Sequence, residues 1–89
     1  MKPEILRFIT AKKLALARKT PLVELTGEKR VLVENHLGVL AYSTEEICVK
    51  VAYGKLVVTG QNLQFLQLNS DQLVIVGEIE TISPLRDLQ

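Results

Sequence analysis

The chain has 89 residues, a length at which we expect one domain with a single hydrophobic core and no separate catalytic layer, which disfavours most enzyme classes. Hydrophobic residues make up 47% of the chain and aromatic residues only 4%, so the core must be built from Leu, Val and Ile, of which Val and Ile favour strands. The formal net charge of +1 provides no overall attraction to nucleic acid or to an anionic membrane.

Charge is nevertheless divided unevenly along the chain. Residues 1–20 hold six basic side chains against Glu4 alone, a formal charge of +5, whereas the remainder holds five basic and nine acidic side chains, a formal charge of −4. We therefore predict a basic N-terminal arm over residues 1–20 in front of an acidic body.

The arm is predicted to contain a short helix. Residues 10–19 are mostly strong helix formers, Thr10 can cap the N-terminus, and Pro21 opposes continuation. The basic groups surround this helix instead of lining one face, which argues against a membrane-surface helix and favours docking of Leu14 or Leu16 on the body.

From Pro21 onward the chain consists of short β-rich segments separated by turn residues, the pattern of an all-β domain. Such short connections cannot hold crossover helices, so neighbouring strands should be mainly antiparallel. We predict a β domain over residues 21–83 and a C-terminal tail over residues 84–89, because Pro84 should end the last strand. The seven expected strands cover residues 22–26, 30–34, 38–43, 46–53, 55–60, 63–68 and 72–82, with Gly60-Gln61-Asn62 as one of the turns.

Two of these strands are apolar on both faces. Leu56–Val58 and Leu73–Val76 each need a second layer, the helix or another subunit to cover their outer side. We therefore expect a two-layer or rolled sheet that self-associates, with Gly77 at a bulge or a close backbone approach.

A faint internal repeat leaves a second architecture open. A short β-solenoid would repeat in the same manner, although hairpin turns account for the same glycines. The echoing segments are Gly54-x-Leu56-x-Val58-x-Gly60, Leu63-x-Phe65 and Leu73-x-Ile75-x-Gly77-x-Ile79.

Glu34, Asn35 and His36 form the one cluster of side chains capable of catalysis or ligand binding. A zinc site needs three or four ligands, yet His36 is the only histidine and Cys48 the only cysteine. A nucleophilic pair of Cys48 and His36 is conceivable if the two lie opposite each other, but no catalytic sequence context surrounds Cys48. We predict no catalytic, metal or cofactor site, and interpret Asn35 as a tight-turn residue and His36 as a turn histidine bonded to a backbone carbonyl or to Glu34.

The single cysteine excludes an intramolecular disulfide and fits a reducing compartment. The N-terminal segment lacks an apolar stretch of signal-peptide length, and no run approaches the roughly 18 apolar residues that span a bilayer. The glycines are too dispersed for a phosphate loop, and the acidic body disfavours nucleic acid. We expect a cytoplasmic protein without a transmembrane segment of its own.

One ordered set of motifs goes beyond these patterns. It comprises Pro21, the Leu25-Thr26-Gly27 turn, Val33-Glu34-Asn35-His36 with Gly38, Gly54-x-Leu56-x-Val58-x-Gly60, Leu63, and Ile75-x-Gly77-x-Ile79-x-x-Ile82. With these motifs the chain resembles the YabP/YqfC family of small sporulation proteins of endospore-forming bacteria, and within it the short YqfC members with a basic helical N-terminus.

The resemblance implies a protein made during spore formation in the mother cell, without an established enzymatic activity and with a membrane-protein partner. It marks a family signature that is structural or partner-facing, namely Glu34, Asn35, His36, Gly38, Gly54, Gly60 and Gly77. We therefore predict a non-enzymatic assembly or adaptor factor that forms homo-oligomers. The alternative is a regulatory binding module whose basic arm contacts anionic lipid or nucleic acid.

Overall fold

The computed structural model describes residues 20–87, which fold into one six-stranded sheet. The strands are β1 (Leu22–Thr26), β2 (Arg30–Glu34), β3 (Val39–Tyr42), β4 (Glu46–Val51), β5 (Gly54–Leu68) and β6 (Gln72–Arg86). Their order is β1-β2-β6-β5-β4-β3, and every pairing is antiparallel. The predicted all-β antiparallel class is confirmed, and the solenoid alternative is wrong because a solenoid stacks parallel strands. The predicted basic arm and its helix lie outside the described residues.

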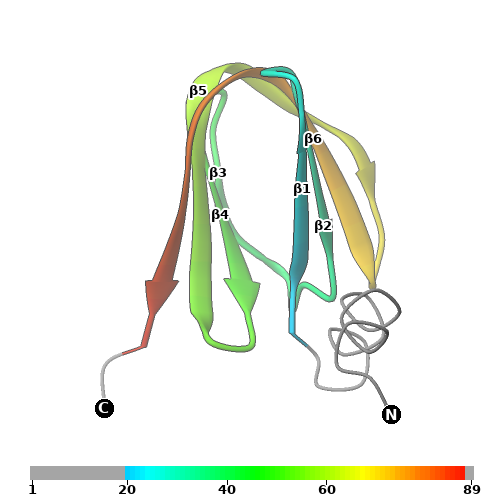
Figure 1. Ribbon diagram of the computed structural model, residues 1–89, viewed down its shortest axis with the longest axis vertical. Helices are drawn as coiled ribbons and strands as arrows, with labels where there is room; N and C mark the ends of the chain where they lie inside the picture. The colour runs from blue at the N-terminus through cyan, green and yellow to red at the C-terminus, as the bar shows by residue number, and fades with distance from the viewer. Residues whose placement is uncertain (1–19, 88–89) are drawn as a thin grey trace, which may run out of the picture.

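Two long strands give the sheet its shape. β5 and β6 have 15 residues each, and both bend where they cross the top of the molecule in Figure 1, so that the two ends of the sheet face each other. The first part of β5 pairs with β4, and the first part of β6 pairs with β2. The sheet thus has two halves. The β3–β4 half contains β3, β4, the first part of β5 and the last part of β6, and the β1–β2 half contains β1, β2, the first part of β6 and the last part of β5.

The bend explains why the count of seven strands is wrong. Gly60, Gln61 and Asn62 do not reverse the chain; they lie inside β5, where the register with β6 shifts on both sides of Gln61. Bulges of this kind increase local twist and bend a strand without ending it. Gly77 faces this point from β6 with φ 141°, and a Cβ atom there would lie 2.6 Å from the carbonyl oxygen of Asn62. The close backbone approach predicted for Gly77 is therefore confirmed.

Pro84 does not end the last strand, as the sequence had suggested it would. β6 continues to Arg86, so the start of the segment assigned to a tail belongs to the sheet. Pro84 pairs with Leu56 in β5, and this part of β6 has no strand on its other side. An edge position tolerates a residue without an N–H group because no second neighbour requires a donor.

The core lies between the two halves of the sheet. It consists of branched aliphatic side chains that alternate along the strands and are at most 2% exposed: Val31, Val33, Ile47, Val49, Val51, Leu56, Val58, Leu63, Leu73 and Ile75. At the top the halves are joined by backbone hydrogen bonds from Gly60 N–H to Glu45 O (3.0 Å) and from Leu63 N–H to Thr44 O (2.8 Å). The folded sheet thus closes around its own apolar face.

Candidate functional site

The segment from Asn35 to Gly38 crosses from the β1–β2 half to the β3–β4 half, and it begins with a turn. Asn35 has φ 65°, a conformation that asparagine adopts more readily than most other residues. Its N–H donates to Asp71 O at 2.7 Å, and its side-chain amide donates to Thr20 O at 3.1 Å. Asn35 therefore turns the chain and attaches the crossover to two neighbouring segments.

His36 is the one buried polar side chain in the described part of the chain, at 7% exposure. Its Nδ1 atom accepts a hydrogen bond from Gly38 N–H at 3.0 Å, and its Nε2 atom lies 2.7 Å from Asn69 O. An amide N–H can only donate and a carbonyl oxygen can only accept, so the ring is neutral with its proton on Nε2. Both ring nitrogens are thus hydrogen-bonded to backbone groups. Of the two partners predicted for His36, a backbone carbonyl or Glu34, the structure shows the carbonyl, that of Asn69.

The turn that receives His36 is itself held in shape. The side-chain oxygen of Asn69 accepts hydrogen bonds from Asp71 N–H at 3.0 Å and from Gln72 N–H at 2.9 Å. Asn69 N–H also donates to Gln72 O at 2.9 Å. His36 consequently joins the crossover to a rigid β5–β6 turn, and we call the bonds of His36 to Gly38 and Asn69 the histidine clasp.

The remaining members of the predicted cluster point elsewhere. Glu34 ends β2 opposite Gln72, on the outer face of the sheet, and is half-buried. Gly38 has φ 124° and continues the β3 side of the crossover, because its carbonyl accepts from Lys50 N–H at 2.8 Å. The sequence cluster is thus divided between an outer face and a backbone clasp.

Cys48 does not form the nucleophilic pair considered above. It is a free, half-buried cysteine in β4, between Ala41 and Val57 on the outer face of the β3–β4 half. The nitrogens of His36 are occupied by Gly38 and Asn69. Within residues 20–87 no three His, Cys, Asp or Glu side chains gather closely enough to hold a metal ion.

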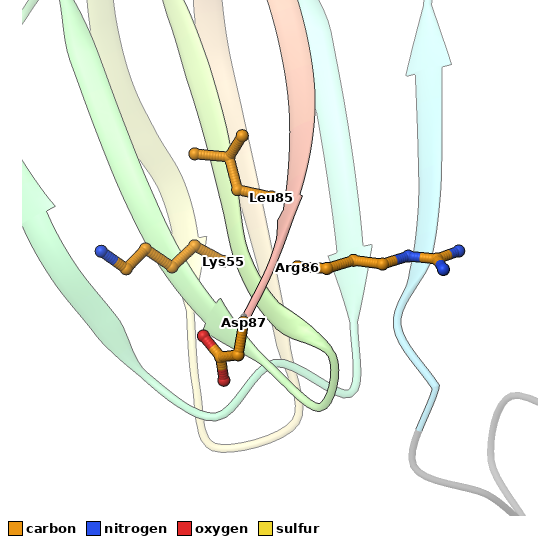
Figure 2. Close-up of a pocket in the computed structure, with 4 residues that line it drawn as sticks. All are labelled: Lys55, Leu85, Arg86 and Asp87. Atoms are coloured by element: carbon orange, nitrogen blue, oxygen red, sulfur yellow. The ribbon is translucent and has the colours of Figure 1, made fainter. Parts of the chain in front are cut away.

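A hollow of about 490 Å³ lies beside the end of β6, lined by Lys55, Leu85, Arg86 and Asp87. Figure 2 shows that Lys55 and Arg86 point in opposite directions from the sheet, so their charges do not converge on one ligand. Nearby, burial raises the pKa of Tyr53 above its usual 10.0, and the positive charge of Arg86 partly opposes this rise. A ligand site needs convergent polar groups, which this hollow lacks.

Two strand edges carry an exposed apolar surface that the sequence does not reveal. Leu40 and Tyr42 on β3 are each 52% exposed, and Leu66 and Leu68 on β5 are 61% and 52% exposed. The Tyr42 and Phe65 rings, whose centroids are 5.3 Å apart, bring these edges together across the two halves. We call Leu40, Tyr42, Leu66 and Leu68 the apolar edge. Its apolar residues are visible in the sequence, but their position at a sheet edge is not, because it depends on strand order.

These features define a small antiparallel β domain whose one buried histidine binds backbone groups and which exposes apolar side chains on two sheet edges.

The chain belongs to the YabP family, whose model matches residues 18–85 and so confirms the resemblance seen in the sequence. It is 23% identical over 62 residues to a Bacillus subtilis (strain 168) protein described as "Uncharacterized protein YqfC", over 70% of this chain and 67% of that relative. No solved structure matches. Within residues 20–87 no helix is long and apolar enough to cross a membrane.

Proposed function

We propose that this protein is a non-enzymatic assembly or adaptor factor of endospore formation. It acts in the cytoplasm of the mother cell, self-associates, and docks on a membrane-protein partner. The sporulation setting rests on family membership, and the assembly role rests on one observation, the apolar edge.

The chemistry of the sheet edges supports this role. Natural proteins protect exposed edges with charged residues or proline, because unpaired backbone groups recruit further strands. The β1 edge carries Glu24, and the β6 edge carries Glu80, Pro84 and Arg86. In contrast, β3 (VLAY) and the last part of β5 (QNLQFLQL) carry no charged residue and no proline. Two edges are therefore protected, and the two that form the apolar edge are open to strand addition by another chain.

The non-enzymatic part of the proposal is supported by how the reactive groups are used. A general base must have a free nitrogen or oxygen within reach of its substrate, and both nitrogens of His36 are bonded to backbone. We expect Cys48 to react with a thiol reagent at the same rate in a His36→Asn variant as in the unaltered chain. A tenfold or larger drop in that rate would indicate a coupled Cys48–His36 pair and contradict the proposal.

A complementation experiment tests the biological role. The gene is deleted in an endospore-forming host that carries it, and heat-resistant spores are counted after return of the unaltered gene, of Leu66→Asp, or of Leu85→Asp. Leu85 is the matched control, because it is a leucine with 51% exposure on the protected β6 edge. We expect the unaltered gene and Leu85→Asp to restore sporulation and Leu66→Asp to fail. Normal sporulation of the deletion strain contradicts a sporulation role, and full rescue by Leu66→Asp contradicts the role of the apolar edge.

A further inference from the structure

The two strands of the apolar edge are joined near both of their ends. Where β3 ends, the Tyr42 ring contacts Phe65, and the Tyr42 hydroxyl group donates to Leu63 O at 3.3 Å. Where β3 begins, His36 in the preceding crossover is hydrogen-bonded to Asn69, which directly follows β5. The free sides of β3 and of the last part of β5 therefore belong to one surface, although the two strands lie in opposite halves of the sheet.

This surface is uncharged, unlike the other pair of sheet edges. Residues 37–42 and 61–68 include no charged side chain, whereas β1 carries Glu24 and the last part of β6 carries Glu80 and Arg86. In a twofold contact between copies the same surface meets itself, so charges of one sign on it would repel one another. A surface without charges avoids this repulsion, and its apolar side chains, each more than half exposed, become covered in pairs.

The position of the open edges limits the number of contacts that one copy can make. An open-ended filament needs two complementary surfaces on different parts of the molecule. Here both open edges belong to one surface, and within residues 20–87 the other two edges carry charged side chains, together with Pro84 on β6. Each copy thus has one surface for strand addition, which favours a closed pair of copies over a filament.

We infer that the apolar edge binds a second copy of this chain across a twofold axis, an inference that rests on the proposed function. The axis is perpendicular to both halves of the sheet, so it turns each edge strand onto its own copy. The last part of β5 pairs with the same segment of the second copy, and β3 faces the β3 strand of the second copy. Both contacts are antiparallel, as is every pairing within the chain. Each half of the sheet then continues into the same half of the second copy.

Disulfide trapping in the full chain tests this geometry. The axis places one residue of the β5 segment opposite its own copy, and a disulfide requires Cα atoms within about 7 Å of each other. Single cysteines are introduced in a Cys48→Ser background at the exposed positions of this segment: Gln64→Cys, Leu66→Cys, Gln67→Cys and Leu68→Cys. The matched control is Leu85→Cys on the protected β6 edge, with 51% exposure.

We expect at least one of the four β5 variants to form disulfide-linked dimers severalfold faster than the Leu85→Cys control. If no position reacts faster than the control, something other than a second copy occupies this edge, and the inference is overturned.

A mixture of two variants separates the twofold pair from a head-to-tail contact. The fastest β5 variant is mixed with a mass-tagged Leu40→Cys variant, whose cysteine lies in β3. We expect disulfides between two β5 segments to exceed mixed disulfides severalfold, because packed sheets lie about 10 Å apart, beyond the reach of a disulfide. A majority of mixed disulfides would mean that β3 of one copy pairs with β5 of the next, which overturns the twofold arrangement.

Light scattering distinguishes this inference from the proposed function. We expect the mass of the unaltered chain to level off at two chains as the concentration rises. A mass that continues to rise, but falls to one chain in Leu66→Asp, would overturn the closed pair and leave assembly through the apolar edge standing. A strict monomer would contradict both.

Discussion

Removal of the histidine clasp should destabilise the fold substantially. In His36→Ala the Gly38 N–H and the Asn69 carbonyl each lose their hydrogen-bond partner, and each of these part-buried bonds contributes about 1 kcal/mol to stability. Truncation of a ring that is 7% exposed adds about 1 kcal/mol from lost packing. We expect a total loss of about 3 kcal/mol, equivalent to a fall in Tm on the order of 15 °C for a domain of this size.

Two conservative variants divide this loss between the bonds. In His36→Gln the side-chain amide can still donate to Asn69, and in His36→Asn the side-chain oxygen can still accept from Gly38, so each should lose about half as much. Urea denaturation measures all three, with Ser70→Ala, an exposed position in the same β5–β6 turn, as the control. A loss below about 0.5 kcal/mol in His36→Ala, the range of ordinary surface substitutions, would refute the structural role of the clasp.

Two other positions give predictions of defined sign. Gly77→Ala should lower the free energy of unfolding by on the order of 3 kcal/mol, because φ is 141° and the added methyl group meets backbone atoms. Gly27→Ala, at a position with φ 59° and open space around it, should lower it by about 1 kcal/mol. Equal losses in urea denaturation would contradict the close approach at Gly77. Burial raises the pKa of Tyr53, so the folded protein retains the phenol proton to a higher pH than the unfolded chain does. The free energy of unfolding should therefore fall as the pH rises above 10.0. The difference in phenolate absorbance between the unaltered chain and Tyr53→Phe should place this titration above pH 10.0, and Arg86→Gln should move it further upward; a downward shift would reverse the assignment.

The fold class could be predicted from the sequence because alternation and turn residues are local signals. The strand count could not, since Gly60, Gln61 and Asn62 are suited to a reversal as well as to a bend. The choice between a reversal and a bend depends on Gly77 in the paired strand β6, because only a glycine there permits the close approach of the Asn62 carbonyl. The effect of Pro84 could not be predicted for a similar reason: it lies at an edge only because β2 pairs with β6 no further than Val76, and this extent of pairing is not visible in the sequence.

The same distinction holds for the site. The sequence shows that His36 belongs to a tight turn, but the carbonyl that it binds lies 33 residues away in a turn brought near by the folding of the sheet. The apolar edge could not be predicted because Tyr42 lies on the last strand of the sheet order and Leu66 lies beyond the part of β5 that pairs with β4, and neither fact is visible in the sequence. Local chemistry was therefore predictable, whereas the choice of partners was not.

The most direct test of the assembly role is the mass of the protein in solution, measured by light scattering over a range of concentrations. The unaltered chain and Leu85→Asp should form species larger than one chain, whereas Leu66→Asp, which places a charge on an edge that has none, should be monomeric. An unaltered chain that is strictly monomeric at high concentration, or a Leu66→Asp variant with the same mass as the unaltered oligomer, would contradict assembly through the apolar edge.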